Sequence, residues 1–235
     1  MFSQIELENI LFLDLETVPV VASYDELPER MQELWDKKSL RYKRNDPDKD
    51  SPTLFAEKAG IHAEFGKIVC ISCGYLRFEN GEPTITLKSF CGHEERELLE
   101  EFGQMLTRYM NSKVRRNLCA HNGKEFDFPY LGRRFLIHGL EIPSILQVYG
   151  KKPWETSFID TMELWKFGDF KAYTSLDLMA AVLGVPSPKD DIDGSQVASV
   201  YYEEQDLDRI RIYCEKDVKT TAQVVLRMSR LPLIS

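Results

Sequence analysis

The sequence predicts an α/β fold in which a mixed central β-sheet is flanked by helices. Three observations predict this class: an apolar run at residues 10–13, a hairpin signal at Asn80–Gly81, and several segments whose apolar residues recur at helical spacing. The chain has 235 residues, and 43% of them are hydrophobic. It is therefore long enough to bury a core, and we expect residues 1–235 to form a single domain with an insertion at about 18–66.

The first strand is expected where the apolar run 10–13 meets the polar residues after it, because a short apolar run with polar flanks is typical of a buried central strand. Residues from about 18 to 66 have a different composition. They contain several prolines, a basic stretch within 37–44 and an acidic stretch within 46–50. We interpret them as an insertion that holds one or two helices and a mobile middle.

After the insertion, the pattern predicts two strands joined by the hairpin turn, then a helix, a short strand and three more helices. A glycine at position 184 is expected to end the second of these three helices. The expected bounds are 68–76 and 84–90 for the two strands, 98–109 for the first helix, 118–120 for the short strand, and 124–137, 175–183 and 207–228 for the last three helices.

The charge and the cysteine content argue against some classes of protein. The net charge is −8, which argues against a protein that coats a long duplex, whereas an acidic chain still binds a phosphate end if metal ions supply positive charge. No apolar run reaches the roughly 18 residues of a membrane span, and the first residues lack the pattern of a signal peptide. The five cysteines favour a reducing compartment over a disulfide-stapled domain. We therefore expect a cytoplasmic protein without a membrane partner.

Two carboxylates end the first predicted strand. Asp14 and Glu16 are two positions apart, so their side chains are expected on the same face of the strand. Both carboxylates ionise readily there only if a cation lies between them, and oxygen ligands suit Mg²⁺ or Mn²⁺. The alternative is an ordinary polar strand end that leads into a loop.

A third acidic residue, Asp127, stands between Phe126 and Phe128 shortly after the predicted strand 118–120. A position between two aromatic residues is unusual for an acid that is solvated by water. The alternative is an acid in the first turn of a helix, where the helix dipole stabilises its charge.

Tyr213 and Asp217 lie on the last predicted helix, four residues apart, so they are neighbours on one face of it. Asp217 stands at the edge of an otherwise apolar stripe, where an acid needs a partner. An aromatic residue that flanks the core, next to an unrelated exposed acid, would give the same pattern.

Taken together and in this order, the three segments resemble the three exonuclease motifs of the DEDD superfamily. The spacing of Tyr213 and Asp217 resembles the tyrosine subclass, because the histidine subclass would have a histidine where this chain has Ile212. The first motif is matched by Asp14 and Glu16, the second by Asp127, and the third by Asp217 with Tyr213.

The second segment also resembles the proofreading exonuclease domain of family B DNA polymerases, from Asn122 through Phe126 and Asp127 to the Pro129–Leu131 stretch. The chain is similar over nearly its full length to stand-alone proteins described as predicted 3′-5′ exonucleases related to that domain. The resemblance implies a ribonuclease H-like fold. It also implies hydrolysis of phosphodiester bonds from the 3′ end of nucleic acid, most readily single-stranded DNA, with release of nucleoside 5′-monophosphates.

The resemblance further implies a role for each motif residue. Two divalent metal ions, Mg²⁺ or Mn²⁺, would be held by Asp14, Glu16, Asp127 and Asp217, with Asp14 shared between them. Tyr213 would orient the attacking water by a hydrogen bond, since a phenol with an ordinary pKa of about 10 is a poor general base.

Three neighbouring residues are expected to bind the substrate. By the same resemblance, Thr17 lies near the terminal 3′-hydroxyl and Asn122 near the terminal nucleotides. Phe126 either stacks on a base or packs in the core. The implied partner is a single-stranded 3′ end, and a replication or repair protein is the partner class that the resemblance suggests.

Other polar residues are interpreted as structural. Cys70 and Cys73 have the spacing of a redox or zinc pair, but residues three apart on a strand point to opposite faces, so we interpret them as buried structural cysteines. Asp160 is expected to cap or support the site from outside the catalytic set. His121 is expected only to line the site.

Three functional classes stay open at this stage. The first is the metal-dependent exonuclease, on DNA or, alternatively, on RNA. The second is a catalytically weak module that binds 3′ ends or assists a polymerase, and the presence of all four acids and the tyrosine argues against it. The third is a domain that binds a small phosphate compound, for which the sequence offers no glycine-rich phosphate loop.

Overall fold

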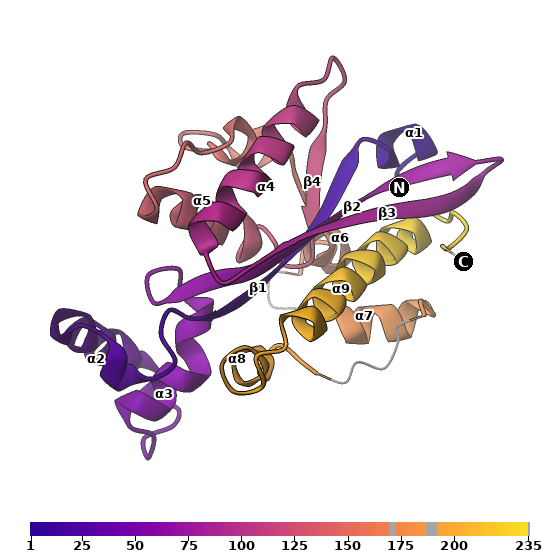
Figure 1. The fold of residues 1–235 in the computed structure, drawn as a ribbon. Helices are drawn as coiled ribbons and strands as arrows, with labels where there is room; N and C mark the ends of the chain where they lie inside the picture. Colours follow the sequence, from indigo (N-terminus) through magenta and orange to yellow (C-terminus); the bar gives the residue numbers. More distant parts are fainter. Residues whose placement is uncertain (170–172, 187–191, 235) are drawn as a thin grey trace.

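The structure is a computed structural model of the chain, and it describes residues 1–169, 173–186 and 192–234. Five strands form one sheet in the order β3-β2-β1-β4-β5 (Figure 1). β1 runs antiparallel to β2 and parallel to β4, and β5 runs parallel to β4. The predicted mixed sheet of an α/β fold is therefore confirmed. The strand bounds are Ile10–Pro19 (β1), Gly66–Glu79 (β2), Glu82–Cys91 (β3), Asn117–Ala120 (β4) and Phe158–Asp160 (β5).

Helices connect and cover these strands. Short 3₁₀ turns accompany them at Tyr24–Glu26 (η1), Ala59–Ile61 (η2), Ser144–Leu146 (η3) and Pro153–Glu155 (η4), with a π-helical turn at Val200–Glu204 (η5). The α-helices are Gln4–Leu7 (α1), Glu29–Lys43 (α2), Ser51–Lys58 (α3), Glu95–Met110 (α4), Asp127–Ile137 (α5), Thr161–Lys166 (α6), Leu176–Leu183 (α7), Val197–Ser199 (α8) and Leu207–Met228 (α9).

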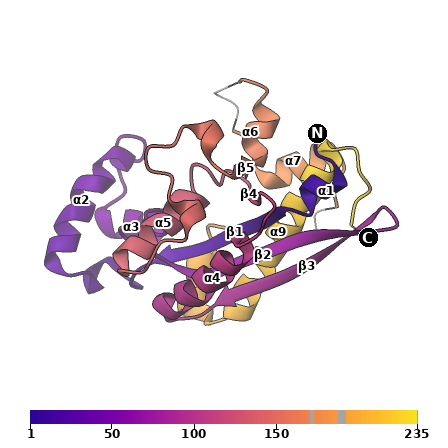
Figure 2. The ribbon, with the colours of Figure 1, turned by 90° about the horizontal axis from the view of Figure 1, so that it is seen from above.

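The helices lie on both faces of the sheet, with α4 and α5 on one face and α9 on the other (Figure 2). Alternation along β1 sorts its side chains between the faces. Leu13 packs with residues of α4 and α5, whereas Phe12 packs with residues of α9. Asp14 and Glu16 follow Phe12 at steps of two, so both carboxylates face α9, as predicted. No helix in the described part of the chain is long and apolar enough to cross a bilayer.

Most predicted elements are confirmed, and the differences concern short segments. Asn80 and Gly81 have φ of 53° and 89°, the left-handed values that a type I′ hairpin needs. Gly184, with φ of 62°, ends α7, and α9 has the predicted bounds. α5 begins at Asp127 and not at residue 124, because residues 123–126 form a turn that ends at Phe126, whose φ of −119° is outside the helical range. Sequence reasoning missed α1, β5, α6, α8 and η5, which are too short to show a period.

Residues 20–65 form a helical insertion between β1 and β2. The Val20 N–H donates to the Phe65 carbonyl oxygen at 2.8 Å, so the two ends of the insertion meet where the antiparallel strands part. Its helices α2 and α3 enclose a small separate core around Trp35. The two predicted helices are therefore present, while a mobile middle stays a prediction. In Figure 1 the insertion extends beyond the end of β1.

Two glycines allow the insertion to lie directly against the main fold. A Cβ atom on Gly60 would lie 3.2 Å from the carbonyl carbon of Val18, and one on Gly66 would lie 2.3 Å from the Tyr130 hydroxyl oxygen. That hydroxyl donates to the Gly60 carbonyl oxygen at 2.8 Å. Ile61, which follows Gly60, is thereby held beside the end of β1.

A buried ion pair joins α4, α5 and β2. Arg134 donates through Nε to Glu95 Oε1 at 2.8 Å, pairs through Nη2 with the other carboxylate oxygen, and donates through Nη1 to the Ala63 carbonyl at 2.7 Å. The Ile68 N–H also donates to Glu95 Oε1, and His138 Nε2 lies 2.8 Å from Glu95 Oε2. The buried Glu95 carboxylate therefore has three partners, Arg134, His138 and the Ile68 N–H, which come from α5, the residue that ends it and β2.

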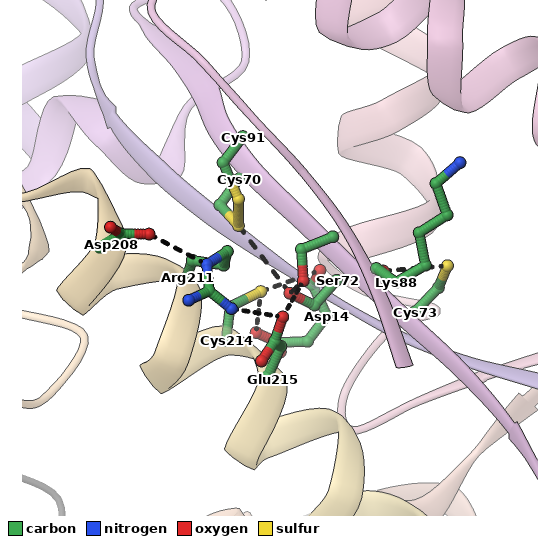
Figure 3. The surroundings of a disulfide bond; sticks show 11 residues. Asp14, Cys70, Ser72, Cys73, Lys88, Cys91, Asp208, Arg211, Cys214 and Glu215 are labelled. Atoms are coloured by element: carbon green, nitrogen blue, oxygen red, sulfur yellow. Dashed lines mark hydrogen bonds and ion pairs between the residues drawn. A yellow bond between two sulfur atoms is a disulfide. The ribbon is translucent and has the colours of Figure 1, made fainter. Parts of the chain in front are cut away.

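The cysteines are buried as predicted, with one difference. Cys70 and Cys73 are both buried, and Cys73 is a free thiol. Cys70, however, is joined by a disulfide to Cys91, which faces it across β2 and β3 (Figure 3). Sequence reasoning missed this pairing, because the antiparallel register brings the two sulfur atoms together from positions 21 residues apart. The reducing compartment stays a prediction.

Candidate active site

A cavity of about 290 Å³ lies at the carboxyl end of β1, where β1, α3, α8 and the start of α9 converge (Figure 1). The insertion, the start of α5 and residues 194–198 complete its wall. Six of the predicted site residues line it: Asp14, Glu16, Thr17, Phe126, Tyr213 and Asp217.

β1 supplies the first pair of carboxylates. Asp14 and Glu16 each place a carboxylate oxygen within 4.8 Å of the other and of the Cys214 sulfur. The pairing of β1 with β2 shifts between Glu16 and Thr17. The residue left without a partner is Val69 of β2. Glu16 and Thr17 line the same cavity although they are consecutive.

α9 supplies the second pair, Tyr213 and Asp217, one helical turn apart. The pKa of Tyr213 is raised far above its usual value by burial and by the charges of Asp217, Glu16 and Asp14. The phenol is hydrogen bonded to Asp217. It therefore remains protonated at neutral pH and is a hydrogen-bond donor, not a base.

Asp127 is the first residue of α5 and is only 3% exposed. It does not line the cavity, but it lies close enough to raise the pKa values of Asp14 and Glu16. Burial raises its own pKa to about 7, with further increases from Asp160 and Asp217, although a hydrogen bond from the Leu15 N–H acts in the opposite direction. That hydrogen bond attaches the start of α5 to β1.

The carboxylates at the cavity repel one another electrostatically. Burial raises the pKa of Asp14 well above its usual range, and the charges of Glu16, Asp217 and Asp127 raise it further. The pKa of Glu16 is raised by burial, then by Asp217 and Asp127. Grouped carboxylates of this kind release their protons easily only beside a cation. An oxygen-donor set from acidic side chains fits Mg²⁺ or Mn²⁺.

A row of small polar side chains supports Asp14, and sequence reasoning missed it (Figure 3). The Cys214 thiol lies 3.3 Å from Asp14 Oδ2 and 3.4 Å from the Asp14 carbonyl oxygen. Ser72 is opposite Asp14 in the sheet, and its hydroxyl lies 2.9 Å from that of Ser89, which donates to Glu215 at 2.6 Å. The periodicity of the sequence predicted only that Cys214 lies on the buried stripe of α9. Ser72 and Ser89 come close to it through the pairing of the strands, which periodicity does not show.

Two predicted neighbours of the site have structural roles. Asp160 caps α6 through the Met162 N–H and accepts the N–H groups of Asn122 and Lys124, each at 3.0 Å. The interpretation of Asp160 as a cap is therefore confirmed. Asn122 does not line the cavity. His121 does not line it either, and its ring nitrogens bind Thr161 and the carbonyl of Thr174.

Comparison with known protein families identifies a relationship. A family model described as a predicted 3′-5′ exonuclease related to the exonuclease domain of PolB matches residues 60–232. The match includes Asp127, Tyr213 and Asp217 and begins after Asp14 and Glu16, so it is shorter than the nearly full-length resemblance expected from the motifs. No curated protein matches the chain.

Proposed function

This chain belongs to the family of predicted 3′-5′ exonucleases related to the exonuclease domain of PolB, and from that premise we propose that it removes nucleotides from the 3′ end of a nucleic acid with two divalent metal ions. The products would be nucleoside 5′-monophosphates. One observation supports this most strongly: the carboxylates of Asp14, Glu16 and Asp217, from distant parts of the sequence, line one cavity, and the buried Asp127 lies close enough to raise the pKa values of the first two.

The metal ligands would be acidic side chains of β1, α5 and α9. Asp14 would be shared between two ions, Glu16 and Asp217 would complete one site, and Asp127 would support the other. When bound, the ions would stabilise negative charge on the attacking and leaving oxygens of an in-line displacement. The raised pKa values of these carboxylates fit a site whose full ionisation requires bound cations.

Tyr213 would orient the water that attacks the phosphorus atom. Its raised pKa keeps the hydroxyl protonated, so a proton on this oxygen remains available for hydrogen bonding at neutral pH. Its contact with Asp217 fixes the phenol beside a proposed metal ligand. These features match the tyrosine subclass that the sequence motif suggests.

Thr17 and Phe126 would contact the terminal nucleotides, because both line the cavity. Ile61 of the insertion also lines it and is half exposed. A cavity with apolar side chains and carboxylates fits an unpaired base together with a metal-bound phosphate. Single-stranded DNA is therefore the proposed substrate, and RNA is the alternative.

The test uses purified protein and 5′-labelled single-stranded DNA and RNA, with Mg²⁺, Mn²⁺ or EDTA. We expect a ladder that shortens from the 3′ end, that EDTA abolishes, and that is absent in Asp217→Asn. Asp208→Asn is the matched control, since Asp208 is an exposed acid on the same helix that pairs with Arg211 outside the cavity. Tight binding of 3′ ends without any cleavage would contradict the proposal and favour a non-catalytic accessory module.

A further inference from the structure

Exposed aromatic side chains are concentrated in one part of the described chain. The four that are mostly exposed all lie between residues 149 and 173, with exposures of 103% for Tyr149, 73% for Trp154, 88% for Phe167 and 73% for Tyr173. Single exposed apolar residues are ordinary on protein surfaces. Four aromatic residues within so short a segment indicate a surface that binds something.

Two of these aromatic residues flank a pair of lysines in the sequence Tyr149-Gly150-Lys151-Lys152-Pro153-Trp154, and every residue of this stretch is exposed. Lys152 places its ammonium 5.3 Å from the centre of the Trp154 ring. Aromatic rings beside cations are the combination that binds single-stranded nucleic acid, because the rings stack on bases while the cations attract phosphates. We call Tyr149, Lys151, Lys152 and Trp154 the aromatic platform.

An apolar groove lies beside the platform. It has a volume of about 710 Å³, and Tyr149, Phe128, Leu136 and Phe158 are among its lining residues. Lys124 and Glu125 line it as well. The next residue, Phe126, lines the candidate active cavity, so consecutive residues at the start of α5 line the groove and the cavity.

The segment that carries the exposed aromatic residues is also attached to the turn before α5. His121 binds Thr161 through Nδ1 at 2.8 Å and the Thr174 carbonyl through Nε2 at 2.9 Å. Lys124 pairs with Glu163 at 2.5 Å. These contacts fix the segment next to the turn that positions Asp127.

We propose that the aromatic platform binds single-stranded nucleic acid several nucleotides upstream of the 3′ end that the active cavity holds. This inference rests on the proposed function, and it adds a second contact region to the same substrate. The two exposed lysines beside aromatic rings, and the lining of groove and cavity by consecutive residues, favour a nucleic-acid strand over a protein partner.

The test compares two variants on 5′-labelled single-stranded DNA of about 4 and about 20 nucleotides. For Tyr149→Ala/Trp154→Ala we expect KM on the longer strand to rise about tenfold or more, since base stacking on aromatic residues contributes that much. KM on the short strand and kcat on both should stay unchanged. For Lys151→Ala/Lys152→Ala, the slope of log Kd against log salt should fall by about 1.4, because two phosphate contacts are lost.

The control is Ile5→Ala/Arg77→Ala, which removes an exposed apolar side chain from α1 and an exposed basic side chain from β2 close to its turn into β3. Unchanged KM for Tyr149→Ala/Trp154→Ala on the longer strand would overturn the proposal and assign the platform to a protein partner. An equal rise on both strands would also overturn it, because the effect would then arise at the cavity. If the wild type cleaves neither strand, the proposed function is wrong. Binding by the platform is then tested separately, by comparing the Kd of wild type and variant for the longer strand in fluorescence anisotropy.

Discussion

The molecule buries carboxylates in two places, and their surroundings are opposite. Glu95 lies between Arg134, His138 and a backbone N–H, so the chain itself supplies its partners. At the end of β1, burial and the other carboxylates instead raise the pKa values of Asp14 and Glu16. The first arrangement is typical of structural support. The second costs stability by itself and is the arrangement expected of the cation site that we propose.

The largest expected effect comes from Asp14→Asn. If Asp14 holds metal ions, exonuclease activity should fall on the order of a thousandfold or more, as for residues that act as a unit. The melting temperature should remain the same or rise, because one of several mutually repelling carboxylates is removed. Activity on labelled DNA and thermal unfolding by circular dichroism measure the two effects. Retained activity, or a large loss of stability, would remove the contrast with Glu95.

The opposite result is expected for Arg134→Met. This change leaves the Glu95 carboxylate buried without its arginine, and it should cost about 3–5 kcal/mol of unfolding free energy in chemical denaturation. Adding Glu95→Leu in the same chain should recover most of that loss, since the uncompensated charge disappears. Arg133→Met, at the exposed neighbouring position, is the control. A loss that the double variant does not recover would show that packing, and not charge, stabilises this cluster.

The dependence of stability on pH tests the cavity in a third way. Asp127 has its pKa raised from 3.8 to about 7 in the folded protein, so between these values the folded state keeps a proton that the unfolded chain has lost. The unfolding free energy of the metal-free protein should therefore fall as pH rises from about 4 to 7. Saturating Mg²⁺ should oppose this fall by about 2.7 kcal/mol at a hundred times its Kd.

Chemical denaturation at pH 5 and pH 7, with and without Mg²⁺, gives the four values that this prediction needs. Asp14→Asn should lose most of the Mg²⁺ effect. If Mg²⁺ leaves the wild-type values unchanged at both pH values, the carboxylates do not form a cation site.

The smallest expected effect comes from Tyr213→Phe. The phenol contacts Asp217 and remains neutral, so its loss removes one hydrogen bond and no charge. We expect kcat to fall about 10- to 100-fold, as for other groups that orient a metal site, while KM changes little. The rate of the wild type should show no decrease near pH 10 from ionisation of this residue. A rise of the rate near pH 10, absent in the variant, would assign Tyr213 the role of a base, because the phenolate would then be the active form.

The sequence predicts the long elements well because their periodicity depends on local spacing. β1, the β2–β3 hairpin, α4, α7 and α9 all agree with expectation, and Asp14 and Glu16 share a face because a strand alternates. What escaped prediction depends on contacts between distant segments. The pairing of Cys70 with Cys91 and the placement of Ser72 opposite Asp14 follow from strand register.

In the candidate site, too, local spacing was predictable and contacts between distant segments were not. The motif residues could be chosen from the sequence, but the absence of Asn122 from the cavity wall could not, because its left-handed φ turns that segment toward Asp160. The sequence also did not predict that Ile61 lines the cavity. It depends on two glycines that let the insertion approach β1.

The ends of the insertion have a consequence for how the protein can change. Val20 and Phe65 are hydrogen-bonded neighbours, and they continue the β1–β2 ladder. In topological terms, residues 21–64 are an enlarged hairpin loop with an independent interior around Trp35. Such a module can be exchanged or shortened to a tight turn without rethreading the sheet. The carboxylates of the candidate site would stay in place, and only the part of the cavity wall that Ile61 provides would change, so the choice of substrate could evolve separately from the proposed chemistry.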